Sequence, residues 1–125
     1  MQQTVLFFAG IYGALAIVLG AFGAHLLKKK FSEDQLASFE TGVRYQIYHA
    51  IVLLIIGTQF ELTSSLEKWM SWGFILGVFL FSFSIYGLTL TSAFGKKWRF
   101  LGPITPLGGL LMIVGWVCLT VFVIS

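Results

Sequence analysis

Apolar residues fall into four long runs that short polar segments separate, at Thr4–Leu27, Phe39–Phe60, Trp69–Thr91 and Pro103–Ser125. A helix needs about 20 mostly apolar residues to cross the hydrocarbon core of a membrane, which is about 30 Å thick. Each run reaches that length, and lipid offers the backbone of a spanning segment no hydrogen-bond partner outside its own helix. The pattern predicts an all-α, integral membrane four-helix bundle with short loops.

Polar signals refine the ends of the second and fourth helices. Ser32 with Gln35 three residues later is a capping-box pattern, and Glu33 and Asp34 suit the positive end of a helix. A helix over 33–60 would be about 42 Å long, so its first turns would protrude, tilt or lie along the surface. Pro103 is tolerated where a helix begins. We therefore expect helices at about 4–27, 33–60, 69–91 and 103–125 in a single transmembrane domain, residues 1–125.

Composition agrees with a membrane protein, because 58% of the 125 residues are hydrophobic and only 10% are charged. A soluble domain of this size would leave roughly a third of its unfolded surface exposed to water. The first run is expected to be a retained helix, since no basic residue precedes Lys28 and the run is longer than a signal-peptide core. No separate polar module is left to bind nucleic acid, so we expect no such partner.

Basic residues predict the orientation of the chain. They cluster after the first and third runs, whereas only Lys68 lies between the second and third. Positive charge is retained on the cytoplasmic side, so both termini are expected on the extracytoplasmic side of a bacterial plasma membrane. The same residues attract anionic lipid headgroups, at about 1 kcal/mol each close to the surface. These candidate headgroup contacts are Lys28, Lys29, Lys30, Lys96, Lys97 and Arg99.

Small residues recur at helical spacing in three of the runs, where they allow close approach of another backbone. Packing within the bundle is favoured over a seam between two copies, but the spacing itself does not separate the two. A homo-oligomer or a membrane-protein partner therefore stays open. The candidate packing residues are Ala9, Gly13, Ala16, Gly20, Ala24, Gly73, Gly77, Gly108 and Gly115.

Polar residues gather in the half of the bundle that is expected to face the cytoplasm. The outer half is almost pure hydrocarbon, with Tyr12 as an exception. A continuous wet channel would need polar residues in both halves, so the pattern predicts a polar network or shallow pocket open to the cytoplasm. The candidate cluster is His25, Glu40, Arg44, Tyr45, Gln46, His49, Ser84 and Tyr86.

Two members of this cluster carry alternative interpretations. A charge deep in the bilayer costs about 2.5–3.5 kcal/mol, so Arg44 needs a partner such as Glu40, in a structural ion pair, or an anionic ligand. His49 is expected to make a structural hydrogen bond, and the alternative roles are a proton-accepting switch or a haem or metal ligand. We expect no metal site, because the chain has two histidines and no cysteine near either; Cys118 is expected to be an inert thiol.

Five sequence blocks resemble a known family: 20–25 (GAFGAH), 39–50 (FETGVRYQIYHA), Phe81-Ser82 with Tyr86, 105–109 and 115–116. They are similar to the small bacterial membrane proteins of the YwdK/YgdD type, a family of unknown function that includes the staphylococcal membrane-stabilising protein. The resemblance implies an integral plasma-membrane protein with four helices and no assigned reaction. It transfers no catalytic or ligand residue, but it adds weight to His25, Arg44, Tyr45, Gln46 and His49.

These observations favour a non-enzymatic, multi-pass membrane protein that supports envelope integrity through helix packing and lipid or protein partners. An alternative is a small transporter or lipid-binding carrier with a cytoplasm-facing site at Arg44 and His49. A second alternative is a haem or quinone protein. No carboxylate pair, nucleophile with its base or phosphate loop is present, so neither an enzyme nor a cofactor is expected.

Overall fold

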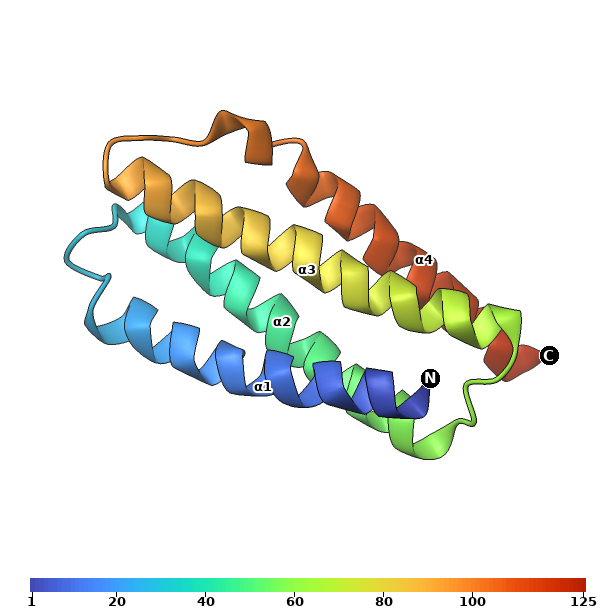
Figure 1. Cartoon of the computed structure of the whole chain (residues 1–125). Helices are drawn as coiled ribbons and strands as arrows, with labels where there is room; N and C mark the ends of the chain where they lie inside the picture. The colour runs from blue at the N-terminus through green and yellow to red at the C-terminus, as the bar shows by residue number, and fades with distance from the viewer.

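A computed structural model describes the whole chain, residues 1–125, and it is all-helical (Figure 1). Four α-helices follow one another in the chain, with one short 3-10 helix before the last. They are α1 (Gln2–His25), α2 (Glu33–Gln59), α3 (Ser65–Ala93), η1 (Arg99–Leu101) and α4 (Ile104–Ile124). The predicted all-α class and the number of long helices are confirmed.

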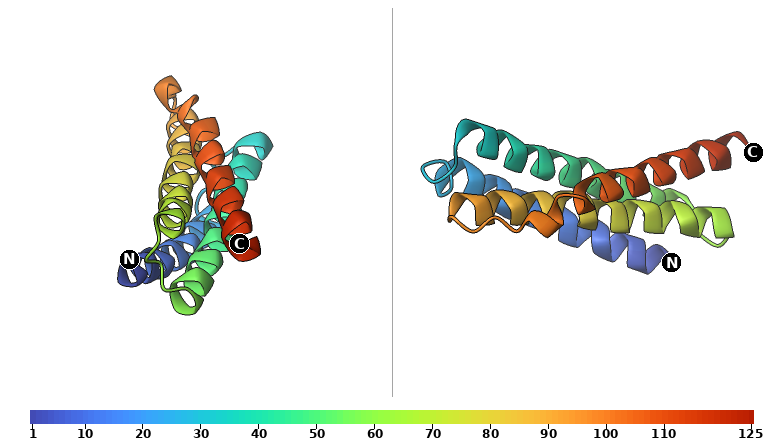
Figure 2. Two further views of the ribbon diagram at one scale, coloured as in Figure 1. Left: turned by 90° about the vertical axis from the view of Figure 1, so that its right-hand side faces the viewer. Right: turned by 90° about the horizontal axis from the view of Figure 1, so that it is seen from above.

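Helices that follow one another in the chain pack against each other. α1 packs on α2, α2 on α3 and α3 on α4, whereas α4 makes backbone contact with α3 and η1 only. Both termini and the α2–α3 loop lie at one end of the bundle, and the two connections that carry the basic clusters lie at the other (Figures 1 and 2). We call the latter the basic end.

Capping residues decide where α2 and α3 begin. Ser32 Oγ accepts from the Gln35 amide at 3.1 Å while the Ser32 amide donates to Gln35 Oε1 at 2.9 Å, which confirms the predicted capping box. An equivalent box joins Ser64 and Glu67, with distances of 3.2 and 3.0 Å. Consequently α3 begins at Ser65 and not at Trp69, because the cap extends the helix beyond the apolar run.

The carboxylate of Glu67 also organises the α2–α3 loop. Besides the Ser64 amide it accepts from the amides of Leu62 at 3.0 Å and Thr63 at 3.2 Å. Leu62 is the only residue other than glycine with a positive φ, 58°, and its side chain is buried. Three backbone donors on one carboxylate thus hold the tight loop in a conformation that leucine rarely adopts.

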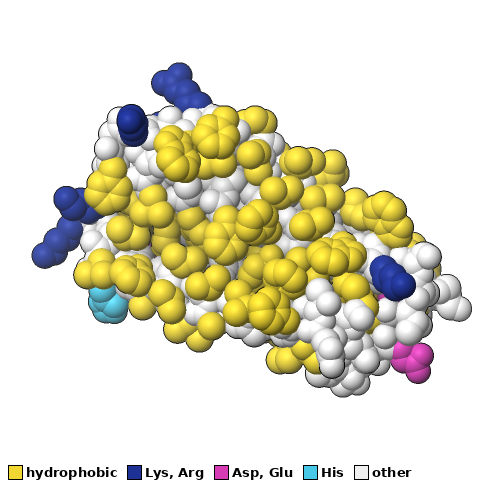
Figure 3. Space-filling view, in the orientation of Figure 1, with side chains coloured by type: hydrophobic (Ala, Val, Ile, Leu, Met, Phe, Trp, Pro, Cys, Tyr) yellow, Lys and Arg dark blue, Asp and Glu magenta, His cyan; other side chains and the backbone are white.

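Hydrophobic side chains cover most of the face shown in Figure 3, and Lys and Arg gather toward the basic end. The exposed apolar residues come from all four helices and include Phe7, Ile17, Leu54, Phe79 and Ile113. Three segments, α1, α3 and Arg99–Ile124, are long and apolar enough to cross a membrane. α2 is not among them, because charged and polar residues in its first half lower its mean hydropathy.

Candidate functional site: a buried polar network and a groove at the basic end

Gln46 lies at the centre of a polar network that joins three helices. Its side chain is fully buried on α2, where Nε2 donates to the Tyr12 carbonyl of α1 at 2.8 Å. The Tyr86 hydroxyl of α3 donates to Gln46 Oε1 at 2.6 Å, and the Tyr12 hydroxyl donates to the Ile75 carbonyl of α3 at 2.7 Å. The amide therefore uses both ends to tie α2 to its two neighbours.

Hydroxyl groups of α3 add two further links. Ser82 Oγ donates to the Gly42 carbonyl of α2 at 2.8 Å. Ser84 Oγ donates to the Phe81 carbonyl at 2.9 Å and lies 2.5 Å from Thr105 Oγ1 at the start of α4. No buried side-chain nitrogen or oxygen is left without a partner. Satisfying polar groups internally is the condition for placing them in an apolar medium.

His49 connects α2 to α4 across the face of α3. Its Nε2 lies 3.2 Å from Trp116 Nε1, and its Nδ1 lies 2.8 Å from the Tyr45 carbonyl. An indole N–H only donates, so Nε2 accepts and Nδ1 carries the proton that goes to the carbonyl. His49 is therefore a neutral ring with both nitrogens engaged. Trp116 was missed as a partner; its only sequence signal was its place in a family block.

Three members of the predicted cluster lie outside this network. His25, Glu40 and Arg44 are all exposed. Arg44 Nη2 donates to Thr41 Oγ1 at 3.2 Å, so the structure pairs Arg44 with a neighbouring hydroxyl and not with Glu40. An exposed ion pair gains little, because water screens the attraction and holding both side chains costs entropy. Of the eight predicted residues, the structure brings Gln46 to Tyr86 and Tyr45 to His49.

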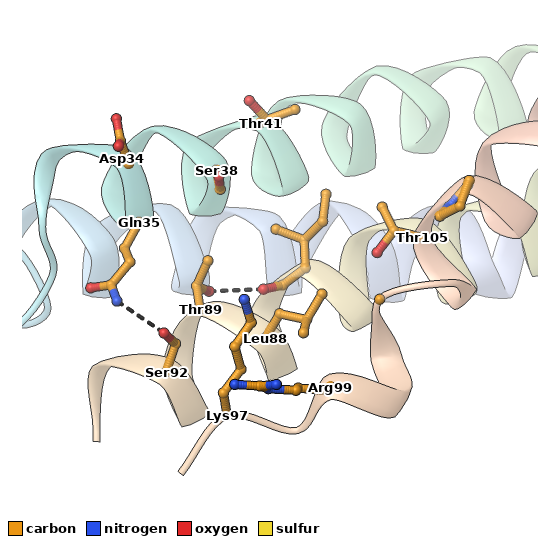
Figure 4. A pocket seen from close by; sticks show the side chains of 13 residues that line it. Asp34, Gln35, Ser38, Thr41, Leu88, Thr89, Ser92, Lys97, Arg99 and Thr105 are labelled. Carbon is orange, nitrogen blue, oxygen red and sulfur yellow. Dashed lines mark hydrogen bonds between the residues drawn. The ribbon is translucent and has the colours of Figure 1, made fainter. Parts of the chain in front are cut away.

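A groove of about 690 Å³ lies at the basic end between α2, α3 and the segment that leads into α4. None of the eight predicted cluster residues lines it. Figure 4 shows Asp34, Ser38 and Thr41 on the α2 side and Lys97 and Arg99 on the opposite side. The complete lining is Asp34, Gln35, Ser38, Thr41, Ile85, Leu88, Thr89, Ser92, Lys97, Arg99, Gly102, Thr105 and Pro106.

The sequence predicted a shallow pocket in this half of the bundle, but among other residues. Of the groove lining it named as site residues only the two cations, Lys97 and Arg99, and these as headgroup contacts. The hydroxyl groups of the groove come from three helices: Ser38 and Thr41 from α2, Thr89 and Ser92 from α3, and Thr105 from α4. Gln35 Nε2 donates to Ser92 Oγ at 3.2 Å and so joins α2 to α3 at one end of the groove. Nowhere in the chain do three or more His, Cys, Asp or Glu residues gather as a metal site would require.

The fold and its surface define a class: an all-helical protein in which three segments are suited to cross a membrane. The chain belongs to the DUF423 family, proteins of unknown function, whose model matches residues 19–109. It is 44% identical to a UPF0382 membrane protein of Staphylococcus haemolyticus, over 89% of this chain and 90% of the relative. UPF0382 membrane proteins of Staphylococcus aureus and Staphylococcus saprophyticus are each 43% identical, over 89% of this chain and 90% and 92% of the relatives.

These relatives confirm the family resemblance that the sequence blocks indicated. Their names describe membrane proteins and assign no reaction or ligand. No solved structure matches the chain.

Proposed function

We propose that this chain is a non-enzymatic, multi-pass plasma-membrane protein that supports membrane integrity through its packing and its contacts with lipids or membrane proteins. The observation that carries the proposal is the division of side chains: apolar ones face outward on all four helices, and the buried polar ones bond to one another or to backbone. Such an exterior fits lipid and not water.

The packing of α2 supports a fourth span despite its polar sequence. Gln46 and His49 point into the bundle and are 0% and 5% exposed, whereas Ile51, Leu54 and Ile55 are more than half exposed. Polar residues in spanning helices face the interior of a bundle. The first turns of α2, with Glu33, Asp34 and Glu40, would lie in the headgroup layer.

Orientation is tested by labelling single cysteines in intact cells, in a Cys118→Ser background. Thr63→Cys in the α2–α3 loop and Lys29→Cys at the basic end are both exposed positions. With the basic end in the cytoplasm, a membrane-impermeant maleimide labels Thr63→Cys only, and Lys29→Cys reacts after the cells are opened. The reverse pattern would refute the orientation.

The integrity role is tested by deleting the gene and measuring uptake of a normally excluded dye under detergent stress. We expect increased uptake that the wild-type gene restores. Unchanged permeability in the deletion strain would contradict the role while leaving the topology intact.

A carrier is the second candidate, and the groove of about 690 Å³ favours it. Its site would then be the groove and not Arg44 with His49, since Arg44 is exposed and Trp116 occupies His49 Nε2. The hydrogen bond from Trp116 to His49 Nε2 also argues against haem ligation by His49, because a bond from this nitrogen to a haem iron would displace Trp116. A purified protein with a Soret band in its absorbance spectrum would reverse that argument.

A further inference from the structure

We propose that the groove at the basic end binds the phosphate group of an anionic lipid, held by Lys97 and Arg99. This site rests on the proposed membrane location and deepens it by naming a ligand class. Two cations and one carboxylate, Asp34, line the groove. Figure 4 shows Asp34 on the α2 side, across the groove from Lys97 and Arg99.

The chemistry of the two cations suits a phosphate. A guanidinium donates two parallel hydrogen bonds to phosphate oxygens, and an ammonium adds a mobile point charge. In the view of Figure 4, the Lys97 side chain extends from the loop toward Thr89 on α3. A volume of about 690 Å³ is within the range of about 300–1,000 Å³ for small-molecule sites, so a headgroup fits.

Hydroxyl groups in the groove complement the cations. Ser92 Oγ accepts from Gln35 Nε2 at 3.2 Å, which leaves the Ser92 hydroxyl proton free for a ligand oxygen. Thr89 donates to the Ile85 carbonyl of its own helix at 2.8 Å and leaves lone pairs that accept from a glycerol hydroxyl. Donors and acceptors thus lie side by side, as a headgroup with both requires.

The surroundings favour a lipid over a soluble phosphate. Soluble phosphate sites commonly use free amides at a helix N-terminus, but Pro103 and Pro106 remove two of those amides from the start of α4. Ile85 and Leu88 make part of the lining apolar. Directly after Thr105 and Pro106 of the lining, α4 carries the exposed apolar residues Leu107 and Leu110, along which acyl chains would continue.

The site is tested by native mass spectrometry of the full chain in detergent, titrated with phosphatidylglycerol, phosphatidylcholine or glycerol 3-phosphate. Lys97→Gln with Arg99→Gln removes the groove cations. Lys28→Gln with Lys29→Gln is the matched control, since these residues lose the same charge at the same end but do not line the groove. Lys30 is left intact because its ammonium lies over the Phe94 ring, 5.9 Å from the centroid.

We expect the wild type to prefer phosphatidylglycerol and the groove variant to lose affinity for it by about 10-fold or more. The control should lose clearly less affinity, because Lys28 and Lys29 do not line the groove and would contribute only the diffuse attraction to a charged bilayer surface, which a detergent micelle lacks. Equal losses in the two variants would overturn the site in favour of diffuse attraction. Glycerol 3-phosphate binding as tight as the lipid would overturn the assignment to lipid.

A steric pair gives an independent check. Ser38→Phe places a ring in the groove, whereas Ala37→Phe adds the same ring at the adjacent exposed position, which does not line it. Binding should fall in the first variant only; equal binding in both contradicts the location. Dye uptake in cells separates this proposal from the proposed function. Lipid binding with normal permeability in the deletion strain would leave the site standing and remove the integrity role.

Discussion

The α3–α4 and α1–α2 pairs carry similar stripes of small residues but pack in different ways. At the α3–α4 interface, a Cβ added to Gly77 would lie 2.8 Å from the Met112 amide and 3.0 Å from the Gly108 carbonyl. One added to Gly73 would lie 3.0 Å from the Gly115 amide. These helices therefore meet backbone to backbone. On α1, by contrast, a Cβ on Gly13 would meet nothing within 4 Å.

The α1–α2 pair is joined by side chains instead. The burial of Ala9, Tyr12 and Ala16 defines the packed face of α1, while Ala24 at the end of the stripe is exposed. Tyr12 receives the bond from Gln46 and donates to Ile75. Lipid gives little hydrophobic drive between helices, so close packing and interhelical hydrogen bonds must hold a bundle. The α3–α4 pair relies more on close backbone packing, and the α1–α2 pair relies more on side-chain contacts and hydrogen bonds.

Gly108→Ala should have the largest effect, because its Cβ would collide with the Phe81 amide of α3. Backbone cannot rotate away as a side chain can, so we expect a loss of about 1–3 kcal/mol or more in unfolding free energy. Gly109→Ala is the control, since its nearest neighbour is the Phe81 ring at 3.8 Å. Unfolding in mixed micelles measures the stability of both variants. Equal stability would refute the close backbone contact between α3 and α4.

Gln46→Leu should follow, because it leaves the Tyr12 carbonyl and the Tyr86 hydroxyl without their partner. We expect a loss of about 1–3 kcal/mol in unfolding free energy. Gln59→Leu, at an exposed position at the end of α2, is the control. A double-mutant cycle with Tyr86→Phe should show coupling; strictly additive losses would mean that the Gln46–Tyr86 bond does not stabilise the fold.

Trp116→Phe should cost less, about 0.5–1.5 kcal/mol, because it removes one interhelical hydrogen bond and keeps an aromatic ring beside Phe74. The close contact between the glycines of α3 and α4 would still hold the two helices together. The same unfolding measurement checks this value. A loss as large as that of Gly108→Ala would show that α4 depends on the His49 link and not on the glycine contact.

Gly13→Ala should be the mildest change, neutral or stabilising by up to about 1 kcal/mol, since alanine favours a helix and the position is open. Size-exclusion chromatography with light scattering should show unchanged mass. A loss of a larger species on this substitution would instead reveal that α1 packs against a second copy.

Local signals in the sequence were enough to predict four long helices and the capping box that begins α2. Each depends on residues close together in the chain, such as Ser32 with Gln35. The start of α3 was predicted wrongly, because the apolar run begins at Trp69 and the capping box of Ser64 and Glu67 was overlooked. That box begins the helix at Ser65.

Only the tertiary structure decided which small residues meet and which polar groups bond. A helix presents its stripe in a direction that depends on its neighbours, so Gly13 and Gly77 look alike in sequence and differ in space. The bond from Trp116 to His49 joins residues from distant parts of the chain, and so does the groove between α2, α3 and the segment that leads into α4. Sequence spacing determines the face that a residue occupies on its own helix, but the rotation and separation of the helices determine what that face touches.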